Sequence, residues 1–117
     1  MKRKSPKWLD DIRVSSHFIL EAVAGKTIED YQANPILRAA VERHFEIIGE
    51  AMNRLARHDP QTAEHIGDYP RIIAFRNILI HGYDLVDDAE VWKVICEHLP
   101  VLAKQVEALL RQAENRQ

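Results

Sequence analysis

Apolar residues recur along much of this chain at the three- and four-residue spacing of an amphipathic α-helix. One such run spans Pro6 to about Ala24 and is followed by Gly25, which favours a helix end at that point. The longest uninterrupted run spans Pro35 to about Arg57. Its apolar side carries Leu37, Val41, Phe45, Ile48, Met52 and Leu55. A stripe this wide can pack against two neighbours, which suits a helical bundle or a subunit interface.

Capping residues and prolines divide the rest of the chain. Short helices are expected over residues 27–32 and 59–66, each opened by a Thr or Asp cap. A further helix starts at Pro70 and carries the sequence up to His81. The final helix is expected from Asp88 to Leu110, with a kink or break near His98 because Pro100 cannot continue a regular helix.

The composition agrees with a helical globular protein. The chain has 117 residues, of which 46% are hydrophobic and 29% charged, with only 4 Gly and 5 Pro. We therefore predict an all-α fold, an antiparallel bundle of four to five helices, formed by a single domain over residues 1–117. Within it, residues 1–6 are expected to be a flexible basic start and residues 111–117 a frayed tail.

Charge and cysteine content narrow the possible functions. A formal net charge of −2 argues against a broad electrostatic grip on nucleic acid, so any such contact would be local. No apolar run approaches the roughly 20 residues of a membrane span. A single cysteine, Cys96, rules out an internal disulfide and suits a reducing compartment, so we expect a cytoplasmic protein. The histidines show no metal-ligand spacing, and neither a metal nor another cofactor is expected.

The chemistry is concentrated in the stretch Phe75-Arg-Asn-Ile-Leu-Ile-His-Gly-Tyr83. Its three consecutive aliphatic residues, 78–80, are expected to be buried along one side. Gly82 should end the helix in the left-handed conformation that glycine tolerates, which places His81 in the last turn. Asn77 and His81 lie four residues apart and share a face, and the long side chain of Arg76 can reach them.

Arg76 and His81 together form a minimal set for phosphoryl chemistry. An arginine offers a bidentate fork for phosphate oxygens, and a histidine donates or accepts a proton near neutral pH. By spacing alone, a structural role is the commoner one. A histidine in a last turn often only complements the helix dipole, and an arginine beside an apolar run often pairs with a carboxylate. Arg43, Glu46 and Glu50 on the long helix could support the cleft or pair with Arg76, or simply form a solvated face.

Other polar residues are assigned structural roles. His44 lies near the apolar stripe and is expected in the core or at an interface. Cys96 is interpreted as a small buried hydrophobe. Tyr31 and Tyr69 are interpreted as packing residues.

Arg76-Asn-Ile-Leu-Ile-His-Gly-Tyr83 resembles the Arg-x4-6-His signature of the HEPN superfamily, in the Arg-x4-His-x-Tyr form of its HepT-like toxins. The stretch from Arg38 to Ala51 is similar to the long second helix of that family, and Tyr69-Pro-Arg-Ile-Ile-Ala-Phe and Val91-Trp-Lys-Val resemble its later segments. The resemblance covers about Leu9 to Leu110.

This resemblance implies several properties. HEPN proteins are helical bundles that dimerise so that both motif helices line one cleft, and many are metal-independent ribonucleases. HepT-like toxins are paired with a nucleotidyltransferase antitoxin of the MntA type, which adenylylates the motif tyrosine, here Tyr83. The expected partners are therefore a second copy of the chain, this antitoxin and an RNA substrate, with no membrane.

Three functional hypotheses follow. In the first, the protein is an endoribonuclease toxin in which His81 transfers protons, Arg76 stabilises the phosphorane and Asn77 orients the substrate or His81. In the second, it is a non-catalytic HEPN-fold binding module that docks a nucleotidyltransferase. The third, a structural bundle without a partner, would make the motif a coincidence. We adopt the first hypothesis.

Overall fold

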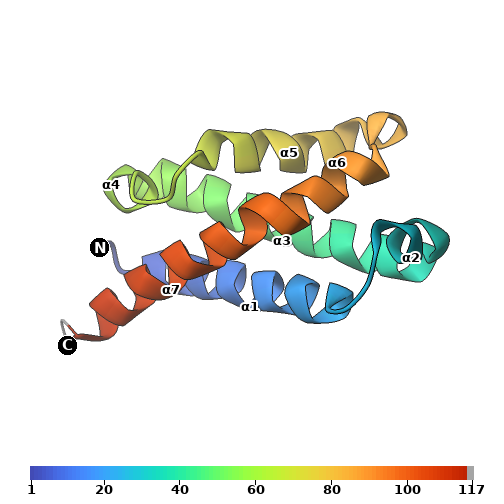
Figure 1. Ribbon diagram of the computed structural model, residues 1–117. Helices are drawn as coiled ribbons and strands as arrows, with labels where there is room; N and C mark the ends of the chain where they lie inside the picture. Colours follow the sequence, from blue (N-terminus) through green and yellow to red (C-terminus); the bar gives the residue numbers. More distant parts are fainter. Residues whose placement is uncertain (116–117) are drawn as a thin grey trace.

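The computed structural model describes residues 1–115 and is helical over most of that length (Figure 1). Two long helices, α1 (Ser5–Val23) and α3 (Pro35–His58), are joined through the short helix α2 (Ile28–Ala33). After α3 come the short α4 (Pro60–Ala63), the motif helix α5 (Tyr69–His81) and a 3-10 turn, η1 (Tyr83–Leu85). The chain then continues through α6 (Asp88–Lys93), a π-helical turn η2 (Val94–His98) and α7 (Leu99–Asn115). The described residues contain no strand, and the predicted all-α bundle is confirmed.

Side-chain caps start most of these helices at the residues expected from the sequence. Thr27 and Asp30 form a reciprocal capping box at α2. The Asn34 side chain accepts a hydrogen bond from the Leu37 amide at the start of α3. The Asp87 carboxylate accepts one from Ala89 at α6. Each cap satisfies an amide that the first turn of a helix leaves without a backbone partner.

The core forms where α1, α3 and α7 pack together. Their fully buried side chains include Leu9, Ile12, Ile19, Val41, Ile48, Met52, Leu55, Leu99 and Val106. α3 lies between α1 on one side and α5 on the other, so its wide apolar stripe is shared by two neighbours. α7 crosses α1 at an angle and diverges from α5 (Figure 1). No helix within residues 1–115 is both long enough and apolar enough to cross a membrane.

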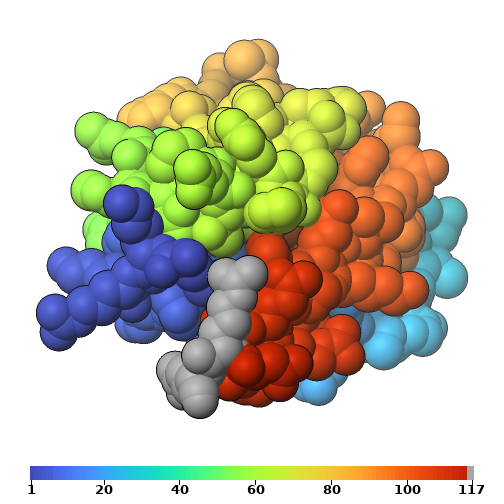
Figure 2. Space-filling view, turned by 90° about the vertical axis from the view of Figure 1, so that its left-hand side faces the viewer, coloured from blue at the N-terminus to red at the C-terminus, as the bar shows by residue number. Residues whose placement is uncertain are grey.

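The start of the chain is attached to the rest of the fold at Asp59. The Asp59 carboxylate accepts hydrogen bonds from the Ser5 hydroxyl at 2.7 Å, the Lys2 amide at 3.0 Å and the Thr62 hydroxyl at 2.6 Å. Figure 2 views this end of the molecule, where the first residues (blue) lie against the green segment around α4. Residues 1–6, expected to be flexible, therefore include two residues that bond to the buried cap of α4.

The last helical segment differs from the sequence expectation at two points. The division expected near His98 is present as the π-helical turn η2, which ends at His98 before Pro100, but the chain then continues as α7 to Asn115, beyond the predicted end at Leu110. Cys96 is exposed rather than buried. Ile95 and Leu99 occupy the core-facing side of this segment, and Cys96 lies off that side. Of the predicted frayed tail, residues 116–117 lie outside the described part.

Candidate active site

The motif helix α5 packs along α3 and has little cover elsewhere. Phe75 meets Phe45 of α3 edge to face, with ring centroids 5.2 Å apart. Of the aliphatic residues 78–80, expected to be buried together, only Leu79 is buried; Ile78 is 48% exposed and Ile80 is half-buried. The reason is that a helix with one neighbour can bury only one side, although α5 is apolar on more than one.

Arg76 lies where α5 packs against Gly49 of α3. Its Nη2 donates to Glu50 Oε2 at 2.9 Å, and its Nη1 donates to Asn77 Oδ1 at 3.0 Å. The Nε atom is buried and has no hydrogen-bond partner among residues 1–115. The arginine side chain is 24% exposed, so the guanidinium is held between the helices with one edge towards solvent.

The close approach depends on Gly49, which sequence reasoning missed. A Cβ atom built at Gly49 would lie 2.1 Å from the Cβ of Arg76 and 2.6 Å from its Cγ. The signal was present: a glycine inside a long helix weakens it and often marks a packing constraint. The sequence alone could not identify which residue it accommodates.

Asn77 and His81 are arranged differently from the expected convergence. The side-chain oxygen of Asn77 accepts from Arg76 and not from His81. His81 is the last residue of α5 and is exposed, with no hydrogen bond or ion pair from its side chain within the described chain. Arg76 and Asn77 are thus brought together, whereas the imidazole extends into solvent at the helix end.

Gly82 ends α5, as expected, but not in the expected conformation. Its φ is −121°, outside the left-handed region, and its amide bonds to the Ile78 carbonyl. A Cβ atom at this position would come no closer than 3.4 Å to that carbonyl oxygen. Tyr83 follows directly as the first residue of η1 and is 77% exposed, so its phenol is accessible at the end of the motif helix.

Only one of the three proposed supporting residues contacts the motif. Glu50 binds Arg76 and also accepts from Arg54 at 3.0 Å, so its carboxylate lies between two cations. Arg43 and Glu46 form a local ion pair one helical turn apart, at 3.5 Å, and among residues 1–115 neither forms a hydrogen bond or ion pair with Arg76.

Two ionisable side chains near Asp88 of α6 have raised pKa values, and burial is the main cause for both. Burial raises the pKa of Glu42, and the negative charge of Asp88 raises it further. Burial is also the main cause of the raised pKa of Tyr31, which is fully buried, and the negative charge of Glu42 raises that pKa further. Within residues 1–115 no group of three His, Cys, Asp or Glu side chains is placed to hold a metal ion.

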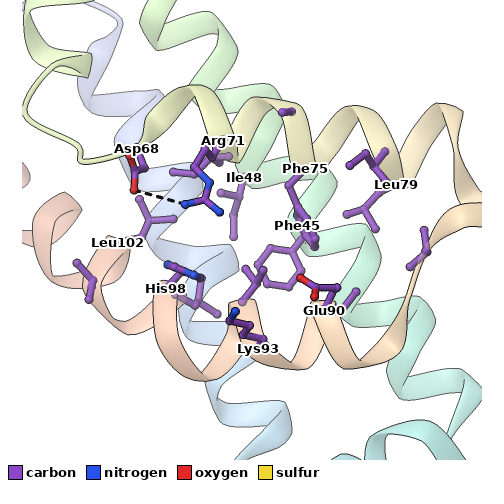
Figure 3. Close-up of a pocket in the computed structure, with 18 of the residues that line it drawn as sticks. Phe45, Ile48, Asp68, Arg71, Phe75, Leu79, Glu90, Lys93, His98 and Leu102 are labelled. Atoms are coloured by element: carbon purple, nitrogen blue, oxygen red, sulfur yellow. Dashed lines mark ion pairs between the residues drawn. The ribbon is translucent and has the colours of Figure 1, made fainter.

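An apolar groove of about 530 Å³ lies on the other flank of α5 (Figure 3). It runs between α5 and the segment from η1 to α7, and Phe45 and Phe75 project into it, while the Asp68–Arg71 ion pair of 3.9 Å closes one end. None of Arg76, Asn77 and His81 lines it. The groove and the polar motif are therefore separate features of the same helix.

The polar face combines a fixed cation with an accessible imidazole. Arg76 is held by two acceptors and keeps further hydrogens on its terminal nitrogens for an incoming anion. His81 can donate or accept a proton in solvent. Such a set can bind a phosphodiester and transfer protons at its oxygens.

Comparison with known proteins agrees with this chemistry. The sequence profile of the family described as "Ribonuclease HepT-like" matches residues 12–109. The chain is 33% identical over 109 residues to "Putative RNase TTE0752" of Caldanaerobacter subterraneus subsp. tengcongensis, covering 92% of this chain and 96% of that protein. It is 31% identical over 109 residues to "Probable ribonuclease HepT" of Thermococcus cleftensis, covering 93% and 98% of the two chains. No solved structure shows a significant match. With a matching profile over most of its length and relatives aligned nearly end to end, the chain belongs to the HepT-like ribonuclease family of the HEPN superfamily.

Proposed function

We propose that this protein is a metal-independent endoribonuclease toxin that cleaves RNA with Arg76 and His81 and is neutralised by adenylylation of Tyr83. The observation that carries the proposal is that α5 bears two suitable groups. Arg76 is held in place by Glu50 and is partly exposed, and His81 is accessible at the helix end. Membership in a ribonuclease family supports RNA as the substrate class.

The cleavage step needs only a base, an acid and a stabiliser of negative charge. A base removes the proton of a ribose 2′-hydroxyl, and that oxygen attacks the adjacent phosphorus to form a phosphorane. An acid then protonates the departing 5′-oxygen, which leaves a 2′,3′-cyclic phosphate and a free 5′-hydroxyl. In this scheme His81 moves the protons, and Arg76 binds the phosphorane oxygens. No step requires a metal.

A homodimer would supply the acid and the base from identical residues. One copy carries a single His81, and the accessible position of that side chain leaves room for a second copy opposite. α5 also exposes apolar surface beyond its contact with α3, including Ile78, which is the kind of surface that a subunit interface covers. Light scattering coupled to gel filtration tests the dimer, and a pH–rate profile with a single limb would contradict the shared acid and base.

Adenylylation would block the site at its entrance. The Tyr83 oxygen would attack the α-phosphorus of ATP, release pyrophosphate and lose its proton, which leaves an AMP group joined through a phosphodiester. Tyr83 lies two residues after His81 and is 77% exposed, so a nucleotidyltransferase of the MntA type could reach it. The added group would oppose RNA binding by its volume and its negative phosphate.

The test is cleavage of total RNA in vitro, with and without EDTA, by purified wild type and variants. Arg76→Ala and His81→Ala should abolish cleavage while retaining helical content by circular dichroism. Tyr83→Phe should retain cleavage and lose adenylylation by the antitoxin. Arg57→Ala is the matched control for arginine, since Arg57 is exposed in the last turn of α3 and lies outside the motif. His65→Ala, at another exposed histidine, is the control for His81.

One alternative function makes an opposite prediction. If the fold serves only to dock a nucleotidyltransferase, wild type and both variants will degrade RNA equally and at background level, while all three still bind the partner. The engagement of Arg76 by Glu50 is the observation that favours this alternative, because a neutralised arginine attracts a phosphate less strongly.

A further inference from the structure

We propose that Gly49 and Glu50 are positioning residues that fix the Arg76 guanidinium before RNA binds, and that Asn77 both orients Arg76 and offers its amide hydrogens to the phosphate. The catalytic part of this inference rests on the proposed ribonuclease function, whereas the positioning part concerns the geometry of Arg76 alone. Gly49 and Glu50 are consecutive in α3 and act on the same arginine from two directions.

Gly49 sets the distance between the helices. A Cβ atom there would meet the Cβ and Cγ atoms of Arg76 at 2.1 and 2.6 Å, whereas carbon atoms in contact lie about 3.5–4.0 Å apart. The Cβ atom of Arg76 is fixed to its backbone, so a rotamer change cannot relieve the overlap. A larger residue at position 49 must therefore move α5 away from α3, by roughly an ångström or more.

Glu50 sets the direction of the side chain. Its Oε2 accepts from Arg76 Nη2, and its Oε1 accepts from Arg54 Nε at 3.0 Å, so the carboxylate is itself held from a second side. The Arg76 Nε atom is buried with no acceptor among residues 1–115. Leaving that donor unpaired costs free energy, which argues that the pair is kept for the placement of the guanidinium rather than for stability.

Asn77 completes the arrangement from the next position on α5. Because its Oδ1 accepts from Arg76 Nη1, its amide nitrogen points away from the arginine. The asparagine is exposed, so those hydrogens face solvent. A phosphate bound to the free hydrogens of Arg76 would thus meet a second donor beside it.

The first test reads the geometry without any enzymatic assay. In ¹⁵N-labelled protein the Arg76 Nε–H should give a signal that exchanges slowly with water, identified by its absence in Arg76→Lys. Gly49→Ala and Glu50→Gln should broaden or abolish this signal. Gly67→Ala is the matched control, because a Cβ atom at Gly67 meets only the Gln105 side chain, at 3.5 Å. An unchanged signal in both Gly49→Ala and Glu50→Gln overturns the inference.

The second test separates positioning from folding. Gly49→Ala is expected to lower kcat on RNA by about 10²-fold, the typical effect of a displacement near 1 Å, with a much smaller change in KM. Gly67→Ala should keep wild-type kcat. If Gly49→Ala does not fold, Glu50→Gln carries the test, since it preserves the size of the side chain. Glu64→Gln, at an exposed glutamate outside this arrangement, is the matched control, and an equal loss of kcat in Glu50→Gln and Glu64→Gln would overturn the role of Glu50.

Chemical rescue tests where the guanidinium is held. In Arg76→Gly the missing side chain should be replaced in part by added guanidinium ion, and in Arg76→Gly/Glu50→Gln the rescue should fall by about 10-fold or more, as expected for loss of a charged hydrogen bond. Adding Gly49→Ala to Arg76→Gly should leave rescue intact, because the Cβ overlap is gone. Rescue that is independent of Glu50 contradicts the inference.

Variants of Asn77 test whether its amide donates hydrogen bonds to the phosphate. Asn77→Asp keeps an acceptor for Arg76 and removes the amide donors, so it should impair cleavage as strongly as Asn77→Ala while retaining the Arg76 Nε–H signal. Full activity of Asn77→Asp would overturn the donor role. If the wild type itself cleaves no RNA, the proposed function fails, and the Nε–H signal still decides whether Gly49 and Glu50 position Arg76.

Discussion

Asp59 and Arg76 are two charged residues held between helices, and their surroundings differ in one respect. The Asp59 carboxylate is 3% exposed and accepts hydrogen bonds from Ser5, Thr62 and the Lys2 amide. The Arg76 side chain is 24% exposed, with one carboxylate and one amide as acceptors and a buried Nε left unpaired. The Asp59 carboxylate therefore has its hydrogen bonds supplied by the fold, whereas Arg76 keeps hydrogens that can bind a ligand.

The difference separates a charge that holds the fold together from one prepared for a ligand. A buried charge whose hydrogen bonds are complete has nothing left to bind. Asp59 also joins the start of α1 to the cap of α4, which are distant in sequence. Arg76 joins only the neighbours α3 and α5, and its side chain keeps 24% of its surface exposed to solvent. Changes at the two charges should therefore affect different measurements.

The largest effect is expected on activity at the motif. Arg76→Ala and His81→Ala should each lower kcat/KM for RNA by about 10²–10⁴-fold, the usual range for a lost charge stabiliser or proton-transfer group. Their urea midpoints should stay near that of the wild type. A variant that loses activity only in proportion to its unfolded fraction would show that its residue stabilises the fold, as Asp59 does, and takes no part in cleavage.

The second effect is expected on stability at Asp59. Asp59→Ala removes an N-cap and leaves the buried Ser5 and Thr62 hydroxyls without their acceptor, which should lower the free energy of unfolding by about 1–3 kcal/mol. Urea denaturation followed by circular dichroism measures it. At temperatures where the variant is folded, its kcat on RNA should equal that of the wild type; a specific loss of activity would contradict the structural assignment.

The third effect is the pH dependence of the stability that the Asp59 carboxylate contributes. Burial of the Asp59 carboxylate raises its pKa, but the hydrogen bonds from Ser5, Thr62 and Lys2 outweigh burial and hold the pKa well below the usual aspartate value. The folded state therefore binds this proton less readily than the unfolded chain, whose aspartate titrates near about 3.9. Its stabilising contribution is complete above that pH and falls as the pH drops below it. The stability difference between wild type and Asp59→Asn should shrink as the pH falls below about 4.

The smallest effect is expected at His44. Its ring stacks on Phe18 with centroids 3.8 Å apart, and its Nδ1 lies 3.0 Å from the Ser15 hydroxyl. Burial and then the charge of Arg43 lower the pKa of His44, so the folded state disfavours the protonated ring. Stability should therefore fall as the pH drops below about 6.5, the value for a free histidine. His44→Gln should flatten this slope in urea titrations; an unchanged slope would assign it to other groups.

Particular residues show why the sequence was informative about the helices. The apolar stripe of α3 and its Asn34-Pro35 start identify one long helix, since periodicity and capping act over only a few residues. Short-range rules also located the end of the motif helix at Gly82, although its φ differs from the expected one. They did not indicate that Pro100 would be accommodated by a π turn or that Cys96 would face solvent.

By itself, the sequence determined the all-α class, most helix boundaries and the Arg76–Tyr83 motif that relates the chain to its family. The tertiary structure decided which of these residues meet. Gly49 and Arg76 are far apart in sequence, and so are Ser5 and Asp59. Whether Ile78 is buried depends on how many helices cover α5, and whether Glu50 reaches Arg76 depends on how closely α5 lies on α3. The physical reason is that helix formation is set by hydrogen bonds four residues apart, whereas the position of a charge is set by packing between helices.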